Sequence, residues 1–340
     1  MKGLCLSMVN MKDVAQEAGV SLGTVSNYLN NKRVRPDAKS RVSNAIEKLH
    51  YVRNNAARDL RTNGSSYVVF VLPTVWTPYF SELTFWMQKE LDQYGYKAIL
   101  CLSENQYEQE KGFVNMAEEQ RVAGIISVSY SNLTSHVHSD IPLVSIEKED
   151  TGLFPLISSD NYSGGQIAAE ELKKRGVNKY LFIGADHISS TAMTARKSGF
   201  IDYCNRNGMY SMLDRVPSTH DEKRFSKQID VIANKIMDSL ADDYNLGIFT
   251  YTDEVALSLY KRLLKEDVNI PEQVQLIGFD GWKLSQDQSL SISSIRQPIK
   301  SIAHNAVEQL DNRIKGKSNE EAPRIMLPVH YLQGDTTKSI

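Results

Sequence analysis

The stretch MKDVAQEAGVSLGTVSNYLNN, Met11 to Asn31, contains two short helical patterns separated by a glycine. In the first pattern Val14, Ala15 and Ala18 share one face of a helix, as a period of 3.6 residues requires. Gly19 follows at the position where helices commonly end in a left-handed turn. A small residue, a turn glycine and a second helix in this order let two helices cross closely, so the stretch predicts a helix-turn-helix.

The second helix is expected to start after Ser21, whose side chain can cap it, and to keep only Val25 and Leu29 for its interior. Its remaining residues are polar or small, which is unusual for a core helix. Hydroxyls, amides and methyl groups meet base edges in the major groove of DNA. This helix is therefore interpreted as the one that reads DNA, and a purely structural helical hairpin is the alternative.

Charge is divided unevenly along the 340 residues, whose formal net charge is -2. Between Met11 and Gly64 ten Lys and Arg stand against five Asp and Glu, whereas Ser65 to Ile340 has 28 basic against 36 acidic residues. A basic head on an acidic body indicates a polyanionic partner at one end of the chain. The expected partner is double-stranded DNA.

A third helix is predicted from Pro36 to Leu49, with Arg35 at its start as a phosphate contact. The next segment, YVRNNAARDLRTNGSS (Tyr51 to Ser66), can form a helix of about two turns capped by Asn54. Such a short helix is marginal alone and is expected to order only when it docks on something. Leu60 is the one large apolar side chain that it offers.

The segments DVAQEAGVSLGTVSNYLNN and RVSNAIEKLHYVRNNAARDLRTN resemble the DNA-binding head of the lac-repressor type (LacI/GalR) family of bacterial transcription regulators. The resemblance implies a homodimer on a near-palindromic operator, with paired hinge helices that pry open the central base step. It also implies residue roles: base reading by Leu22, Gly23 and Asn27, backbone support or contact by Ser21, Thr24 and Ser26, and hinge positions at Ala57 and Leu60.

Several positions depart from the usual pattern of that family. Arg35 and Ala38 stand where Ser and Thr are common, and Arg53 replaces a Pro before the hinge. Gly23 has no side chain at a base-reading position, so the operator sequence does not carry over from any relative.

From Tyr67 onward strand and helix patterns alternate, which indicates parallel sheets. Continuous apolar runs, as strands buried on both faces require, predict strands at Tyr67–Leu72, YKAILCLS, Gly124–Ser129, Pro142–Lys148, KYLFIGA, Leu246–Thr252 and Gln275–Asp280. Helices are expected between them, followed by a helix at Ile299–Lys315 and one last strand, RIMLPVHYL. Two such sheets with a crevice between them make a two-lobed binding fold.

The predicted organisation has four parts: an N-terminal extension (1–10), a helix-turn-helix domain (11–52), a hinge helix and linker (53–65), and an effector-binding and dimerisation domain (66–340). Lobe 1 is expected at about 66–162 and 295–323, and lobe 2 at about 163–294 and 324–340. The fold class is thus an all-α helix-turn-helix head plus an α/β two-lobed, periplasmic-binding-protein-like effector domain with parallel sheets.

Ligands of parallel α/β sheets bind beyond the carboxyl ends of the strands, where this sequence places aromatic, hydroxyl and acidic side chains. Aromatic rings stack on the apolar faces of sugars and carboxylates bind paired hydroxyls, so a carbohydrate effector is expected. TPYFSEL, ISSDNYSGG, TARKSGF, TYTDEVAL and IGFDGW also resemble the family's pocket edges, which implies ligand hydrogen bonds from Arg196, Asp253 and Asp280, with Asp160 lining the cleft. The candidate ligand-binding residues are Trp76, Tyr79, Phe80, Ser103, Ser127, Glu147, Asp160, Arg196, Asp253, Asp280 and Trp282.

Several of these candidates have a structural alternative. Ordinary packing is the alternative for Trp76 and Trp282, a helix N-cap for Asp160, and a surface salt bridge for Arg196. A nucleobase, or a phosphocarrier protein bound outside the body, is the alternative to a sugar. A solute-binding protein is a third possibility, which the DNA-reading head disfavours.

Catalysis, cofactors and metals are not expected. The sequence has no GxSxG, no P-loop and no GxGxxG after a strand, and Gly164-Gly165 is too little for a phosphate cradle. Reduced thiols and no metal site are expected, since CxxC spacing and suitable ligand neighbours are missing around Cys5, Cys101, Cys204, His136 and His138. No apolar stretch suits a signal peptide or a membrane span, so a cytoplasmic protein is predicted.

Overall fold

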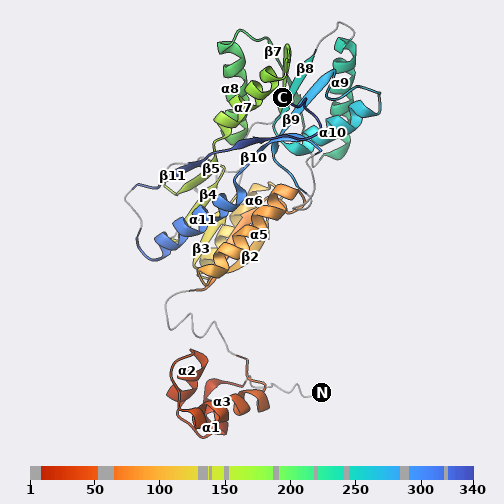
Figure 1. Ribbon diagram of the computed structural model, residues 1–340. Helices are drawn as coiled ribbons and strands as arrows, with labels where there is room; N and C mark the ends of the chain where they lie inside the picture. The colour runs from red at the N-terminus through yellow and green to blue at the C-terminus, as the bar shows by residue number, and fades with distance from the viewer. Residues whose placement is uncertain are drawn as a thin grey trace. The chain divides into compact units, whose positions relative to one another are not determined.

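The structure, a computed structural model, describes residues 9–52, 65–128, 137, 140–148, 153–186, 191–217, 221–240, 245–283, 291–317 and 321–340. The chain divides into two compact units, residues 1–64 and 65–340. Figure 1 shows their elements. In the described part of the chain, no helix has the length and apolar character to cross a membrane.

The first unit contains α1 (Met11–Ala18), α2 (Leu22–Leu29) and α3 (Pro36–Lys48). Asn10 starts α1, because its side chain accepts hydrogen bonds from the backbone N–H groups of Lys12 and Asp13. Gly19 ends α1 in the left-handed conformation, with φ 60°. Buried side chains of all three helices form one small core: Val14, Ala15, Ala18, Val25, Val42 and Ala45. The helix-turn-helix prediction is confirmed.

The second unit contains two six-stranded sheets. The first sheet is parallel, in the order β11-β5-β4-β3-β1-β2. Its helices are α5 (Pro78–Gln93) and α11 (Ile299–Ile314), which share one core, and α6 (Tyr107–Glu119), which belongs to another. The strands are β1 (Tyr67–Leu72), β2 (Lys97–Leu102), β3 (Gly124–Ser127), β4 (Leu143–Ile146), β5 (Leu156–Ser159) and β11 (Arg324–Leu327).

The second sheet has the order β12-β10-β9-β8-β6-β7, and only β12 runs antiparallel to its neighbour. In Figure 1, α7 and α8 lie on one side of it and α9 and α10 on the other. The strands are β6 (Lys179–Ala185), β7 (Ser211–Val216), β8 (Leu246–Thr250), β9 (Val274–Asp280), β10 (Ser293–Arg296) and β12 (His330–Leu332). The helices are α7 (Asn161–Lys174), α8 (Thr191–Arg206), α9 (Glu222–Leu240) and α10 (Asp253–Leu264).

The predicted last strand, RIMLPVHYL, is in fact two strands in different sheets. β11 pairs with β5 in the first sheet, whereas β12 pairs with β10 in the second. Pro328 lies between them, and a proline cannot donate to a ladder. The chain therefore crosses between lobes after residue 327 rather than at 323, and β10 keeps residues 293–296 in the second lobe.

Three segments thus connect the lobes: β5 to α7, β10 to α11, and β11 to β12. The first and third are hydrogen-bonded to each other, since the Asp160 backbone N–H donates to the Leu327 carbonyl at 2.8 Å.

Close packing of α7 against α8 depends on two glycines. A Cβ at Gly165 would lie 2.1 Å from the carbonyl oxygen of Arg196, and one at Gly199 would lie 1.9 Å from that of Tyr162. Gly165 therefore serves helix packing, which holds the backbone of α8 at Arg196 against α7.

Gly199→Ala is expected to lower the free energy of unfolding by about 2 kcal/mol, because the two helix backbones must move apart. Urea unfolding measures this change. Gly112→Ala on α6 is the matched control: a Cβ there meets nothing within 4 Å, and alanine is the better helix former. Equal effects of the two substitutions would contradict the packing argument.

Candidate functional site

In the first unit, α2 presents the predicted base-reading residues on its exposed side. Leu22, Gly23 and Asn27 are exposed, while Val25 is fully buried. Leu22 keeps 42% of its surface exposed, which is unusual for a leucine in a small helical unit. An apolar group beside an amide provides the chemistry to contact thymine methyl groups and base edges.

The other residues predicted around α2 mainly fix the local structure. Ser21 Oγ accepts a hydrogen bond from the Thr24 backbone N–H at 3.2 Å and lies 3.0 Å from Thr24 Oγ1. Ser26 is half-buried, and its carbonyl accepts from Asn30 Nδ2. Arg35 is exposed immediately before α3. The predicted hinge residues lie outside the described part of the chain: Arg53, Asn54, Ala57 and Leu60.

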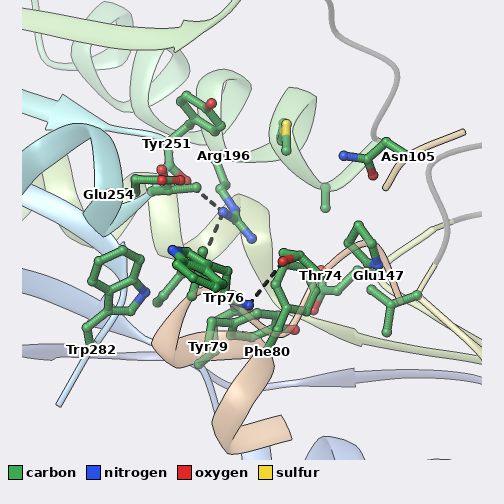
Figure 2. Close-up of a pocket in the computed structure, with 18 of the residues that line it drawn as sticks. Thr74, Trp76, Tyr79, Phe80, Asn105, Glu147, Arg196, Tyr251, Glu254 and Trp282 are labelled. Atoms are coloured by element: carbon green, nitrogen blue, oxygen red, sulfur yellow. Dashed lines mark hydrogen bonds and ion pairs between the residues drawn. The ribbon is translucent and has the colours of Figure 1, made fainter. Parts of the chain in front are cut away.

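In the second unit, a cavity of about 690 Å³ opens between the lobes. One wall comes from the loops that follow β1 to β4, and the other from α8, α9 and the loops after β8 and β9. Seven of the eleven predicted ligand residues line it: Trp76, Tyr79, Phe80, Glu147, Arg196, Asp280 and Trp282. Figure 2 shows the Arg196 side chain pointing into this cavity from α8.

The other four predicted residues do not line the cavity. The Ser103 hydroxyl donates to Glu110 Oε1 at 3.2 Å. Asp160 caps α7, accepting from the Ser163 backbone N–H at 3.0 Å. Asp253 Oδ2 accepts from the Trp282 backbone N–H, and its Oδ1 from Ser294 Oγ. The Ser127 hydroxyl is buried, with no partner among the described residues.

Sequence reasoning missed other lining residues. The lining residues that follow β2 and β8 lie at strand ends, so the strand-end rule could have predicted them. The lining residues on α8 and α9 could not be predicted in this way, because their position depends on how the helices pack. Gln297 lies in a segment between the lobes, and only the folded structure shows that it reaches the cavity. The missed residues are Pro73, Thr77, Glu104, Asn105, Val128, Ala192, Met193, Glu222, Phe225, Tyr251, Thr252, Glu254 and Gln297.

Arg196 is 5% exposed and its position is fixed by neighbours on several sides. Nε donates to Asn161 Oδ1 at 2.8 Å, and Nη1 donates to the Tyr251 carbonyl at 2.7 Å. Its guanidinium carbon lies 3.6 Å from the ring centroid of Phe279. Nη1 is also 3.9 Å from Asp280 Oδ1. The predicted alternative of a surface salt bridge is therefore wrong.

Arg196 belongs to a closed ring of six buried residues, the hinge ring, which spans two of the segments between the lobes. From Arg196 the ring passes through Asn161 to Glu147 Oε2, which accepts from Asn161 Nδ2 at 2.8 Å. Glu147 Oε1 accepts from the Ser159 backbone N–H at 2.7 Å, and Ser159 Oγ donates to Gln297 Oε1 at 2.7 Å. Gln297 Nε2 donates to Asp280 Oδ1 at 2.7 Å, which closes the ring at Arg196.

Two members of the hinge ring have unusual backbone conformations. Glu147 has φ 64° and Asp280 has φ 120°, and residues other than glycine rarely adopt positive φ values of this kind. Strain of this kind persists only where surrounding contacts determine the conformation, and it is concentrated at functional sites. Here the two strained residues, Glu147 and Asp280, are also the two ring members whose carboxyl groups line the cavity.

Burial raises the pKa of Asp280 to about 6, although the Arg196 charge and the Gln297 hydrogen bond favour its ionised form. Burial and then the neighbouring Asp280 charge also raise the pKa of Asp253 well above its ordinary value. The cavity floor thus holds one carboxyl group that is costly to ionise, that of Asp280, and the Asp253 carboxyl is buried behind the cavity lining.

Asp280→Asn is expected to become more stable relative to the wild type as the pH rises. A carboxyl whose pKa is higher in the folded chain than in the unfolded chain, about 3.9, destabilises the fold as the pH rises from about 4 through about 6. The amide removes this loss, so the difference in unfolding free energy should shift by about 1–3 kcal/mol in favour of the variant between pH 4 and pH 7. Urea unfolding across this range measures it, with the exposed Asp140→Asn as control. A difference that stays constant with pH would contradict the raised pKa.

Comparison with known proteins matches both units. Residues 10–54 match the family model described as bacterial regulatory proteins, lacI family, and residues 169–337 match a periplasmic binding protein-like domain. A sucrose operon repressor of Streptococcus mutans is 30% identical over 334 residues, covering 97% of this chain and 99% of that protein. The transcriptional repressor PurR of Vibrio atlanticus is 29% identical, covering 98% and 100%.

Solved structures agree with the fold. A periplasmic binding protein/LacI transcriptional regulator from Alkaliphilus metalliredigens, complexed with D-xylulofuranose, is 28% identical, with a TM-score of 0.69 over 81% of this chain and all of that one. The lac repressor dimer bound to operator gives a TM-score of 0.80 at 19% identity, over 97% and 99% of the two chains. The exposed face of α2, the two-lobed cavity and a full-length relative at 30% identity agree, and the chain therefore belongs to the lacI family of bacterial regulatory proteins, which are ligand-controlled, DNA-binding transcriptional repressors.

Proposed function

We propose that this protein binds an operator as a homodimer in the cytoplasm, and that a sugar held between its two lobes sets its affinity for DNA. The observation that carries the choice of a sugar is the cavity itself, where aromatic rings and carboxyl groups surround Arg196. The cavity binds and releases its ligand without chemistry. The lacI family assignment disfavours the alternative of a solute-binding protein.

The cavity has the components that a sugar requires. Trp76 lies at the edge of the cavity and is 92% exposed, so its flat apolar ring face is available for stacking. Thr252 lines the wall, and its hydroxyl is buried behind the surface without a partner among the described residues. The indole N–H of Trp282 is also buried, facing Asp280 but outside hydrogen-bond geometry. Relatives support this choice by name: sucrose and ribose operon repressors, and a regulator solved with cellobiose.

A sugar in the cavity is favoured over the two alternative effectors. A phosphocarrier protein on the outside of the body would leave this cavity without a role. A nucleobase is flat and would use the aromatic rings, but the many carboxyl groups suit hydroxyl donors around a ring better than the mixed edge of a base.

For DNA binding, Leu22, Gly23 and Asn27 are proposed to meet the bases, with Arg35 on a phosphate. The hinge contacts proposed at Asn54, Ala57 and Leu60 rest on the family resemblance. Two copies of α2 in a dimer suit a palindromic site.

Asn27→Ala should weaken binding to the selected operator by about 10–100-fold, because an amide that pairs with a base edge contributes about 1–3 kcal/mol. The operator is first obtained by selection from random duplex DNA, and affinities are then measured by fluorescence anisotropy at fixed salt. Asn44→Ala, an exposed asparagine on α3, is the matched control and should change affinity less than threefold. An intact protein that selects no sequence would overturn the proposed regulator.

Trp76→Ala should weaken sugar binding about tenfold without changing the unfolding midpoint of the free protein, since the ring is exposed before the ligand binds. Isothermal titration of the full chain with the sugar that raises its midpoint most measures the effect. Tyr210→Ala, another exposed aromatic residue, is the control. Equal affinity for wild type and Trp76→Ala would exclude stacking on this ring.

A further inference from the structure

Charge in the interlobe cavity is strongly one-sided. Arg196 is the only Lys or Arg among the described residues that line it. Five lining residues carry a carboxyl group: Glu104, Glu147, Glu222, Glu254 and Asp280.

The rest of the second unit supplies no further permanent cation for this cavity. Between Ser65 and Ile340, the segments outside the described residues contain no Lys and no Arg in their sequence. These segments contain four histidines, and the test below is set at pH 8 because a histidine side chain in water, with a pKa near 6.5, is neutral there. Arg196 is thus the one permanent positive charge available to a ligand in the cavity.

Arg196 is already engaged by the protein. Its Nε and Nη1 donate to Asn161 and to the Tyr251 carbonyl, and the same guanidinium lies beside Asp280. A phosphate ester needs several charge-assisted donors, preferably from a free guanidinium fork. One remaining edge of Arg196 can satisfy a hydroxyl but not a dianion.

Three of the helices that begin beside the cavity are poor sites for a phosphate, whereas the first turn of α8, from which Ala192 and Met193 line the cavity, contains no acidic residue. A helix N-terminus ordinarily attracts phosphate through its free backbone N–H groups. Here α5 has Pro78, which has no N–H, in its first turn. The first turns of α9 and α10 contain acidic residues that line the cavity, Glu222 in α9 and Glu254 in α10. These acids already complement the helix dipoles and repel a second anion.

We infer that the cavity selects a sugar without phosphate or carboxylate groups and excludes the phosphorylated form of the same sugar. This inference rests on the proposed function, because it specifies the charge of the proposed effector. Neutral hydroxyl donors satisfy the carboxyl groups of the cavity, whereas a phosphate dianion meets five carboxyl groups and one engaged cation.

The test compares matched pairs with the full chain at pH 8: glucose and glucose 6-phosphate, fructose and fructose 6-phosphate, ribose and ribose 5-phosphate, sucrose and sucrose 6-phosphate. Thermal unfolding identifies binders, and titration calorimetry gives dissociation constants. A sugar that binds at least tenfold more tightly than its phosphate, a difference of about 1.4 kcal/mol, is the expected result. A phosphate ester that binds as tightly as its parent would overturn the inference while leaving a small-molecule effector in place. If neither member of any pair binds, the proposed sugar effector fails and the inference fails with it.

Substitutions then test whether charge is the cause. In Glu222→Gln/Glu254→Gln, the ratio of phosphate-ester affinity to parent-sugar affinity should rise at least threefold, because two repelling charges are removed. The control, Glu119→Gln/Glu321→Gln, changes two exposed glutamates that do not line the cavity and should leave the ratio unchanged. A ratio that stays constant in the first variant would show that the carboxyl groups do not set the selectivity.

Discussion

The hinge ring joins segments from both lobes through buried polar groups, each of which is the hydrogen-bond or ion-pair partner of the next. A buried donor or acceptor left unsatisfied costs about 1–3 kcal/mol, so each member of the ring constrains the next. Ser159 and Gln297 belong to different segments between the lobes, and their side chains are directly hydrogen-bonded. Arg196 and Asp280 take their positions on the cavity floor from this constraint, as do the strained conformations at Glu147 and Asp280.

The ring also gives a reason for burying charged groups that stability alone does not require. Replacing a buried ionic network with well-packed apolar residues is often neutral or stabilising, so stability alone does not account for it. In this fold Glu147, Arg196, Asp280 and Gln297 are shared between the ring and the cavity wall. The same polar atoms therefore hold the lobes and meet whatever enters between them.

The sequence was informative where a periodic pattern coincides with burial. The long helix α11, and apolar strands such as β1 and β9, were predicted close to their observed bounds. Strands β5 and β10, LISS and SSIR, were missed because they are short and rich in serine, although both are buried inside their sheets. For the site, the strand-end rule identified Trp76, Glu147 and Asp280. The rule was wrong for Asp160, whose carboxylate caps a helix. It could not predict Gln297, which does not follow a strand of the predicted pattern.

The size of the free energies involved decides whether the hinge ring can couple ligand binding to DNA binding. A tenfold change in operator affinity corresponds to about 1.4 kcal/mol of difference between two lobe arrangements. A ligand supplies this only through contacts that differ between the arrangements, and one buried hydrogen bond contributes about 1 kcal/mol net. Because four ring members line the cavity, a sugar hydroxyl that replaces one partner in the ring changes the bonds across the lobes at the same time. One or two such exchanges are sufficient for the tenfold change, without a large rearrangement of either sheet.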